Sequence, residues 1–153
     1  MKIRRIQRDS AHEEFIKTLT SGDQAVFREI WRVLLFAAAL GVKKGQRTPL
    51  KEVDSGKAFP ESYFNSPGWK GFLYLLGFCD SESSDHLRND EKEQEKLVIS
   101  FEEYANAGLY IMKEAVTSSK DPLGDVAALI EENTKEELTA PDVSDLGGDD
   151  GQL

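Results

Sequence analysis

The sequence contains few of the residue types on which metal, disulfide or covalent chemistry depends. One cysteine, Cys79, and two histidines occur among its 153 residues. A single cysteine cannot form an intrachain disulfide, and no histidine, cysteine or carboxylate cluster stands at metal-ligand spacing. We therefore expect no metal, no cofactor and no catalytic residue. Cys79 is expected to be a small buried or half-buried thiol, because no base that would activate it lies nearby in the sequence.

Long apolar runs are missing as well. No stretch approaches the roughly 18 apolar residues of a membrane-spanning helix, and the basic N-terminus, MKIRRIQRDS, lacks the apolar core of a signal peptide. We expect a cytoplasmic protein that does not contact membranes. Apolar residues make up 39% of the chain, below the roughly 45–50% of globular domains, so part of the chain is expected to lie outside the core.

Negative charge is concentrated near the C-terminus. The formal net charge is −9, and residues 121–153 hold ten acidic groups and one basic group, which accounts for all of it. We interpret the chain as a helical domain, 1–138, followed by an acidic disordered tail, 139–153. The tail has too few apolar residues to offset the entropy lost on ordering, so it should be dispensable for folding.

The segment 23–41 is the only long stretch dense in large apolar residues. These residues recur at three- and four-residue spacing, and from 33 to 40 they surround the helix, which predicts a central core helix. Asp23 is expected to be its N-cap, and Gly41 the left-handed residue that ends it. The cations that follow, up to Pro49, then belong to a loop.

Further helices complete a mostly α fold, a single compact domain of about five helices. The apolar spacing predicts them at 11–19, 68–79, 101–119 and from 122 onward. Trp69 and Phe72 are more typical of a core than of a stacking surface.

Two segments resist a regular assignment. Residues 48–64 are punctuated by proline and glycine, which predicts an irregular or hairpin segment. The polar residues 80–96 are predicted to form either a loop that leads to an exposed helix of mixed charge or a disordered insertion.

Three of these helices carry start signals. Residues 10–13, SAHE, and residues 100–103, SFEE, each match a capping box, and Asp121 precedes a proline at the first helical position. His12 would then lie in an exposed first turn, where a ligand role is not expected.

One glycine inside a predicted helix indicates close packing. Gly108 lies within 101–119, where glycine costs about 1 kcal/mol relative to alanine. The expected compensation is a helix crossing in which Ala105 and Gly108 face the small residues 37–39.

Cations occur in two groups that would form one patch if the N-terminal arm lay beside the 42–48 loop. Such a patch would contact a partner or the phosphates of DNA, and phosphate contacts would make binding steeply salt-dependent. The candidate residues are Lys2, Arg4, Arg5, Arg8, Lys43, Lys44 and Arg47.

Two stretches are specific enough to carry a family resemblance: FAAALGVKKGQRTP at 36–49 and FEEYANAGL at 101–109. In this order and spacing they resemble a family of small accessory proteins encoded beside bacterial DNA phosphorothioation (Dnd) genes. The resemblance implies a context of DNA modification and defence but no reaction, and no catalytic residue is carried over. We interpret the motif residues as structural: Phe36, Gly41, Phe101, Glu102, Glu103, Tyr104, Asn106 and Gly108.

The sequence is best interpreted as a non-enzymatic accessory or adaptor of a phosphorothioation-linked modification or restriction system. It would act through a protein component of that system, in antiphage defence. One alternative is an accessory that contacts DNA through the basic arm and the 43–47 loop. Another is a small metal-dependent hydrolase or nuclease, which would need clustered carboxylates. Its candidates, Asp80, Asp85, Asp90, Glu102 and Glu103, do not show that spacing.

Overall fold

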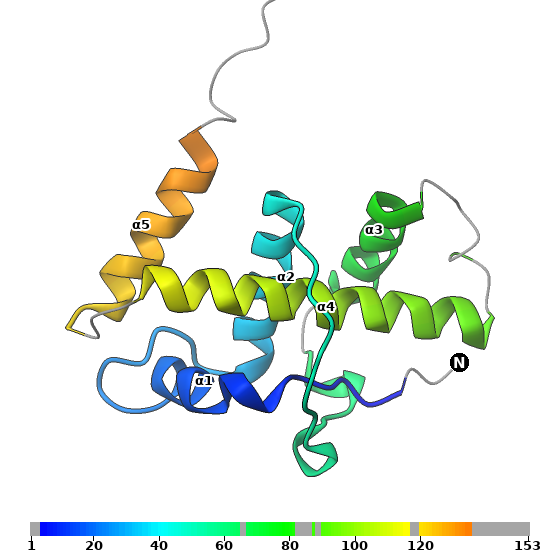
Figure 1. The fold of residues 1–153 in the computed structure, drawn as a ribbon, viewed down its shortest axis with the longest axis horizontal. Coiled ribbons are helices and arrows are strands. Elements are labelled where there is room, and N and C mark those ends of the chain that lie inside the picture. Colours follow the sequence, from blue (N-terminus) through cyan, green and yellow to red (C-terminus); the bar gives the residue numbers. More distant parts are fainter. Residues whose placement is uncertain (1–3, 65–66, 82–86, 88–89, 117–119, 136–153) are drawn as a thin grey trace, which may run out of the picture.

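The computed structural model describes residues 4–64, 67–81, 87, 90–116 and 120–135. In these ranges the chain forms α1 (Glu13–Thr20), α2 (Ile30–Lys44), α3 (Trp69–Ser81), α4 (Glu91–Ala115) and α5 (Pro122–Thr134). Three short 3-10 helices join them, and the described ranges hold only isolated β-bridges. The predicted single helical domain is confirmed. Figure 1 shows α4 running across the molecule, with α2 and α3 packed against it and α5 at its end.

The central apolar segment forms a shorter helix than its pattern predicts. α2 begins at Ile30, and Asp23 is not its N-cap. Residues 21–29 instead turn back on α1, because the Leu19 carbonyl accepts hydrogen bonds from the amides of Val26 and Phe27 at 2.9 and 3.0 Å. Both of those side chains pack against the core without being helical.

The end of α2 also lies later than predicted. Gly45, with φ 62°, is the left-handed residue that ends the helix, whereas Gly41 is buried inside it. Lys43 and Lys44 therefore belong to the last helical turn, where cations interact favourably with the helix dipole.

α4 is a single helix of 25 residues and absorbs part of the polar stretch that precedes it. Its N-cap is Asp90, whose side chain accepts from the Lys92 amide at 2.9 Å. Ser100 is therefore mid-helix, and the predicted capping box at 100–103 is wrong. Along the helix Leu97, Phe101 and other apolar side chains are buried, which makes α4 the support for its neighbours.

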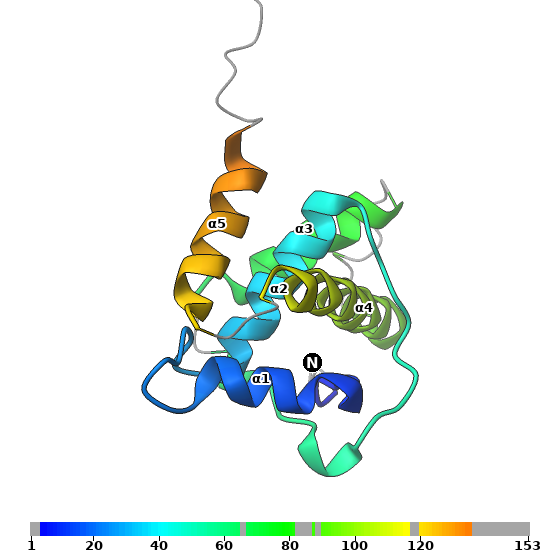
Figure 2. The ribbon, with the colours of Figure 1, turned by 60° about the vertical axis from the view of Figure 1, so that its left-hand side comes forward.

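The predicted helix crossing is confirmed, and it is reciprocal. A Cβ on Gly108 of α4 would collide with the backbone of Ala37 in α2. A Cβ on Gly41 of α2 would likewise collide with the backbone carbonyl of Tyr104 in α4. Each helix thus has a glycine that lies against the main chain of the other helix. Figures 1 and 2 both show α4 lying across α2.

The start of α1 differs from the predicted capping box. Asp9 caps a 3-10 turn, Ser10–His12, by accepting from the Ala11 amide at 3.0 Å. The Ser10 hydroxyl instead donates to the Glu52 carbonyl at 3.1 Å. His12 is fully buried rather than exposed.

The segment after α2 is irregular, which is one of the two structures predicted for residues 48–64. It pairs with the N-terminal arm through single antiparallel bridges, Ile6 with Phe59 and Asp9 with Val53. Between and after them lie two 3-10 helices, Ser55–Lys57 and Glu61–Tyr63. Trp69 is buried in the core, as expected.

The last described helix starts as predicted. Asp121 accepts from the Gly124 amide at 3.0 Å, with a proline in the first turn. Val126 and Leu129 face the core, whereas Leu123 and Ile130 are exposed. The acidic tail predicted at 139–153 lies outside the described residues.

The crossing generates a stability prediction. Gly108→Ala should destabilise the protein by about 3 kcal/mol or more, because the obstructing atoms are backbone and cannot rotate away. The matched control is Gly71→Ala in α3, where a Cβ would meet nothing within 4 Å. That change should leave stability unchanged or raise it by up to about 1 kcal/mol. Urea unfolding measures both, and a Gly108→Ala protein as stable as wild type would contradict the crossing.

Candidate functional site

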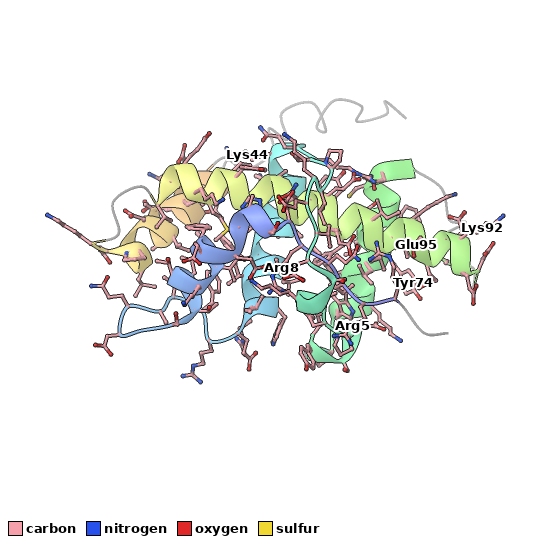
Figure 3. All side chains as sticks on the ribbon, turned by 60° about the horizontal axis from the view of Figure 1, so that its bottom comes forward. Arg5, Arg8, Lys44, Tyr74, Lys92 and Glu95 are labelled. Atoms are coloured by element: carbon pink, nitrogen blue, oxygen red, sulfur yellow. The ribbon has the colours of Figure 1, made fainter. Side chains whose placement is uncertain are left out.

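The structure divides the predicted basic patch between the two ends of α2. Arg5 and Arg8 lie beside its first turn, while Lys43 and Lys44 are in its last turn. A 15-residue helix is about 22 Å long, so the two groups are well separated. Figure 3 shows Lys44 far from Arg5 and Arg8. Lys2 lies outside the described residues, and DNA contact by any of these cations stays a prediction.

Arg4 is held by carboxylates of α4. Its guanidinium donates to both oxygens of Glu102 at 2.7 and 2.8 Å and to Glu95 at 2.7 Å. The hydrogen bond to Glu102 is the main cause that raises the Arg4 pKa above its usual range. Glu102, which is buried, also accepts from the Gln7 amide at 2.7 Å. This motif carboxylate therefore fastens the N-terminal arm to α4.

Arg47 forms the centre of a second group, which we call the Arg47 cluster: Arg47, Asp80, Ser100, Glu103 and Tyr104. Arg47 donates to Glu103 and, at 2.7 Å, to Asp80. Asp80 also accepts from the hydroxyls of Ser100 and Tyr104. Burial and the hydrogen bond to Asp80 raise the pKa of Tyr104 to about 12. The cluster thus joins the loop after α2 to both α3 and α4.

Asn106 connects three segments at the buried side of α4. Its Nδ2 donates to the carbonyls of Thr48 and Pro49, at 3.1 Å each, which leaves Oδ1 facing His12 Nε2 at 2.7 Å. Because Oδ1 can only accept, Nε2 must carry the proton. His12 Nδ1 is then an acceptor, and it has no partner among the described atoms.

The capping-box pattern predicted an exposed position for His12, so its buried contact with Asn106 was not foreseen. Burial lowers its pKa, and the nearby Lys113 ammonium lowers it further, whereas the hydrogen bond to Asn106 acts in the opposite direction. A signal was present, because His12, Ile16 and Leu19 fall at positions i, i+4 and i+7, on one helical face.

Arg5 and Arg8 line a pocket of about 580 Å³, which we call the basic–aromatic pocket. The residues that give it its character are Arg5, Arg8, Lys57, Glu29, Trp31, Phe59 and Tyr63. They come from the arm, from the first turn of α2 and from the irregular segment. Lys57 and Tyr63 were not among the predicted site residues, because the irregular segment that carries them has no periodicity from which to infer neighbours.

α3 carries an apolar outer face. Leu73 and Leu76 are buried, whereas Leu75 and Phe78 are 65% and 47% exposed. Cys79 is exposed too, so the expected buried thiol is wrong. Leu75 and Phe78 are three residues apart and point away from the buried side of the helix, and Cys79 lies one turn after Leu75 at the flank of this surface. We call this surface the α3 face.

Metal binding and membrane insertion are two further properties on which the described residues bear. Among the described residues, no three or more histidine, cysteine, aspartate or glutamate side chains are placed to hold a metal ion together. None of the described helices combines the length and the apolar character needed to cross a membrane.

Fold and surface together define a small helical protein with an apolar helix face and a basic pocket. A family model described as DNA sulphur modification system-associated protein 4 matches residues 5–147. The chain belongs to this family, which links it to a DNA sulphur modification system and agrees with the resemblance seen in the motifs. Searches of curated proteins and of solved structures gave no match.

The burial of His12 generates a prediction about pH. Its folded-state pKa should lie below 6.5, because a proton on Nδ1 would place a buried donor without an acceptor. An NMR titration of His86→Gln, which leaves His12 as the only imidazole, measures this pKa directly. A resonance that titrates at or above 6.5 would contradict the tautomer and the burial.

The same shift fixes the sign of a stability effect. In the unfolded chain the His12 imidazole takes up a proton as the pH falls below 6.5, whereas in the folded protein it does so only at a lower pH. The contribution of His12 to stability is therefore complete above pH 6.5. It is lost as the pH falls from there toward the lower folded-state pKa. Urea unfolding across this pH window measures the free energy of unfolding at each pH. In a His12→Gln variant, the part of its pH dependence that comes from His12 should be absent.

Proposed function

We propose that the protein is a non-enzymatic accessory of a DNA sulphur modification system, or of restriction linked to it. It binds a protein component of that system through the α3 face, and we expect it to act in the cytoplasm. The family membership gives the context. The observation that carries the proposal is the exposure of Leu75 and Phe78 side by side on α3.

The composition of the α3 face supports a protein partner. Large apolar side chains gathered on one face are typical of the centre of an interface, where aromatic residues are enriched and charges are depleted. Leu75, Phe78 and Cys79 provide such a centre.

The contacts of the candidate carboxylates support a non-enzymatic role. A general acid or base must reach its substrate, and a metal site needs oxygens that converge on one ion. Glu102 is bound to Arg4, Glu103 to Arg47, and Asp90 caps α4. Asp80 accepts from three donors, and Asp85 lies outside the described residues. Glu102, Glu103 and Asp80 therefore hold segments of the chain together, and Asp90 caps its own helix.

The proposal is tested by co-purification from a host that carries the neighbouring DNA sulphur modification genes. Tagged wild-type protein should recover a protein component of the system, and Leu75→Glu should lose it. The matched control is Leu123→Glu on α5. Leu123 is 63% exposed, against 65% for Leu75, and the change adds the same charge to a helix of the same length.

Both variants should keep the wild-type melting temperature within a few degrees, since exposed substitutions change stability by about 0.5 kcal/mol or less. Leu123→Glu should still recover the component. Two results would contradict the proposal: equal recovery with Leu75→Glu, or recovery of no system component by the wild type.

A further inference from the structure

The basic–aromatic pocket is built on a rigid frame. Ile6 and Phe59 form an antiparallel bridge with N–H···O distances of 2.9 and 3.2 Å. Because side chains alternate along an extended chain, the burial of Ile6 turns Arg5 outward. Arg5 then lies against Ala58, whose carbonyl accepts from its Nε at 2.9 Å and also from Nη2.

Two cations of the pocket are available to an anion. Arg5 uses two of its five N–H donors on Ala58, which leaves donors for a ligand. The Lys57 side chain is 47% exposed, and its ion pair with Glu13 is long, at 3.3 Å. Arg8 is more enclosed and is held by Glu13 and by the Lys57 carbonyl, so it contributes charge rather than direct contact.

An exposed aromatic ring stands beside these cations. Tyr63 stacks on Phe59 with ring centroids 5.7 Å apart and planes within 10°. Tyr63 is nevertheless 60% exposed, so its second face is open to a flat ligand. The 3-10 helix that carries it is anchored, because Glu61 accepts from the Trp69 indole N–H at 3.1 Å.

The first turn of α2 adds to the positive potential of the pocket. Ile30 and Trp31 belong to its lining. The carboxylate of the N-cap Glu29 caps no backbone amide of the helix and instead pairs with Arg32 at 3.3 Å, and the first turn holds no acidic residue. Helix N-termini present amide donors and a partial positive charge. This feature strengthens a site that the cations and the aromatic ring already form.

We propose that the basic–aromatic pocket binds one nucleotide of a single-stranded DNA segment. Arg5 and Lys57 hold the phosphate, and the base stacks on Tyr63. Cations beside a stacking ring are the combination by which proteins bind single strands. The pocket, at about 580 Å³, lies within the range of roughly 300–1,000 Å³ typical of ligand sites. This site is separate from the α3 face and does not depend on it.

Stacking determines which form of DNA fits. A base can lie on Tyr63 only if it is unpaired, since the bases of a duplex are already stacked and hydrogen-bonded. The association of the family with a DNA sulphur modification system makes DNA the relevant polymer.

The test is fluorescence anisotropy with the full chain and a labelled oligothymidylate of about 12 nucleotides. Tyr63→Ala should raise the Kd about tenfold or more, and Tyr63→Phe, which keeps the ring, should stay close to wild type. Lys57→Gln should weaken binding and reduce the dependence of log Kd on log salt by about 0.7. The matched control is Lys44→Gln, the same change at the other end of α2, which should leave binding unchanged.

Several results would overturn the proposal. These are no binding by the wild type, wild-type affinity for Tyr63→Ala in a folded protein, or equal weakening by Lys44→Gln and Lys57→Gln. Leu75→Glu should bind DNA as the wild type does, so that failure of this site is distinguishable from failure of the protein-docking role.

Competition identifies the source of the nucleotide. Unlabelled strand should compete at far lower concentration than thymidine monophosphate, inorganic phosphate or a duplex. Monophosphate that competes as well as the strand would assign the pocket to free nucleotides, and an equally effective duplex would exclude stacking of an unpaired base. Either result would overturn the assignment to single-stranded DNA.

Discussion

The close approach of the α2 and α4 backbones is the contact on which the rest of the structure depends. Gly41 and Gly108 make it possible, each lying against the main chain of the other helix. The position of α2 on α4 determines where both ends of α2 lie. One end contributes to the basic–aromatic pocket, and the other leads into the loop held by the Arg47 cluster.

The polar residues of α4 then attach the parts of the chain that are not helical. Glu102 binds the N-terminal arm, Glu103 binds Arg47, and Asn106 binds His12 and the carbonyl of Thr48 in the loop after α2. The FEEYAN stretch therefore has a structural meaning, in which successive side chains of one helix each fasten a different segment. Both surfaces proposed to bind partners lie on segments that this arrangement positions.

A glycine inside a predicted helix indicated the crossing at Gly108, although its partner, Ala37, lies far away in the chain. Other local patterns predicted the fold class and the start of α5, because each depends on neighbouring residues. They failed where a distant partner decides the outcome. Ser100 resembles an N-cap, yet α4 continues through it, and its hydroxyl binds Asp80. The partners of Glu102 and the neighbours of Tyr63 come from segments far away in the chain, and no local period reveals them.

Native-state hydrogen exchange tests the central role of the crossing most directly. Amides at 37–41 of α2 and 104–108 of α4 should exchange most slowly, with a free energy equal to that of global unfolding. Amides of α1 and α5 should exchange faster through local opening, since those helices bury less. The account would be contradicted if the crossing amides exchanged at a lower free energy than those of α1 or α5.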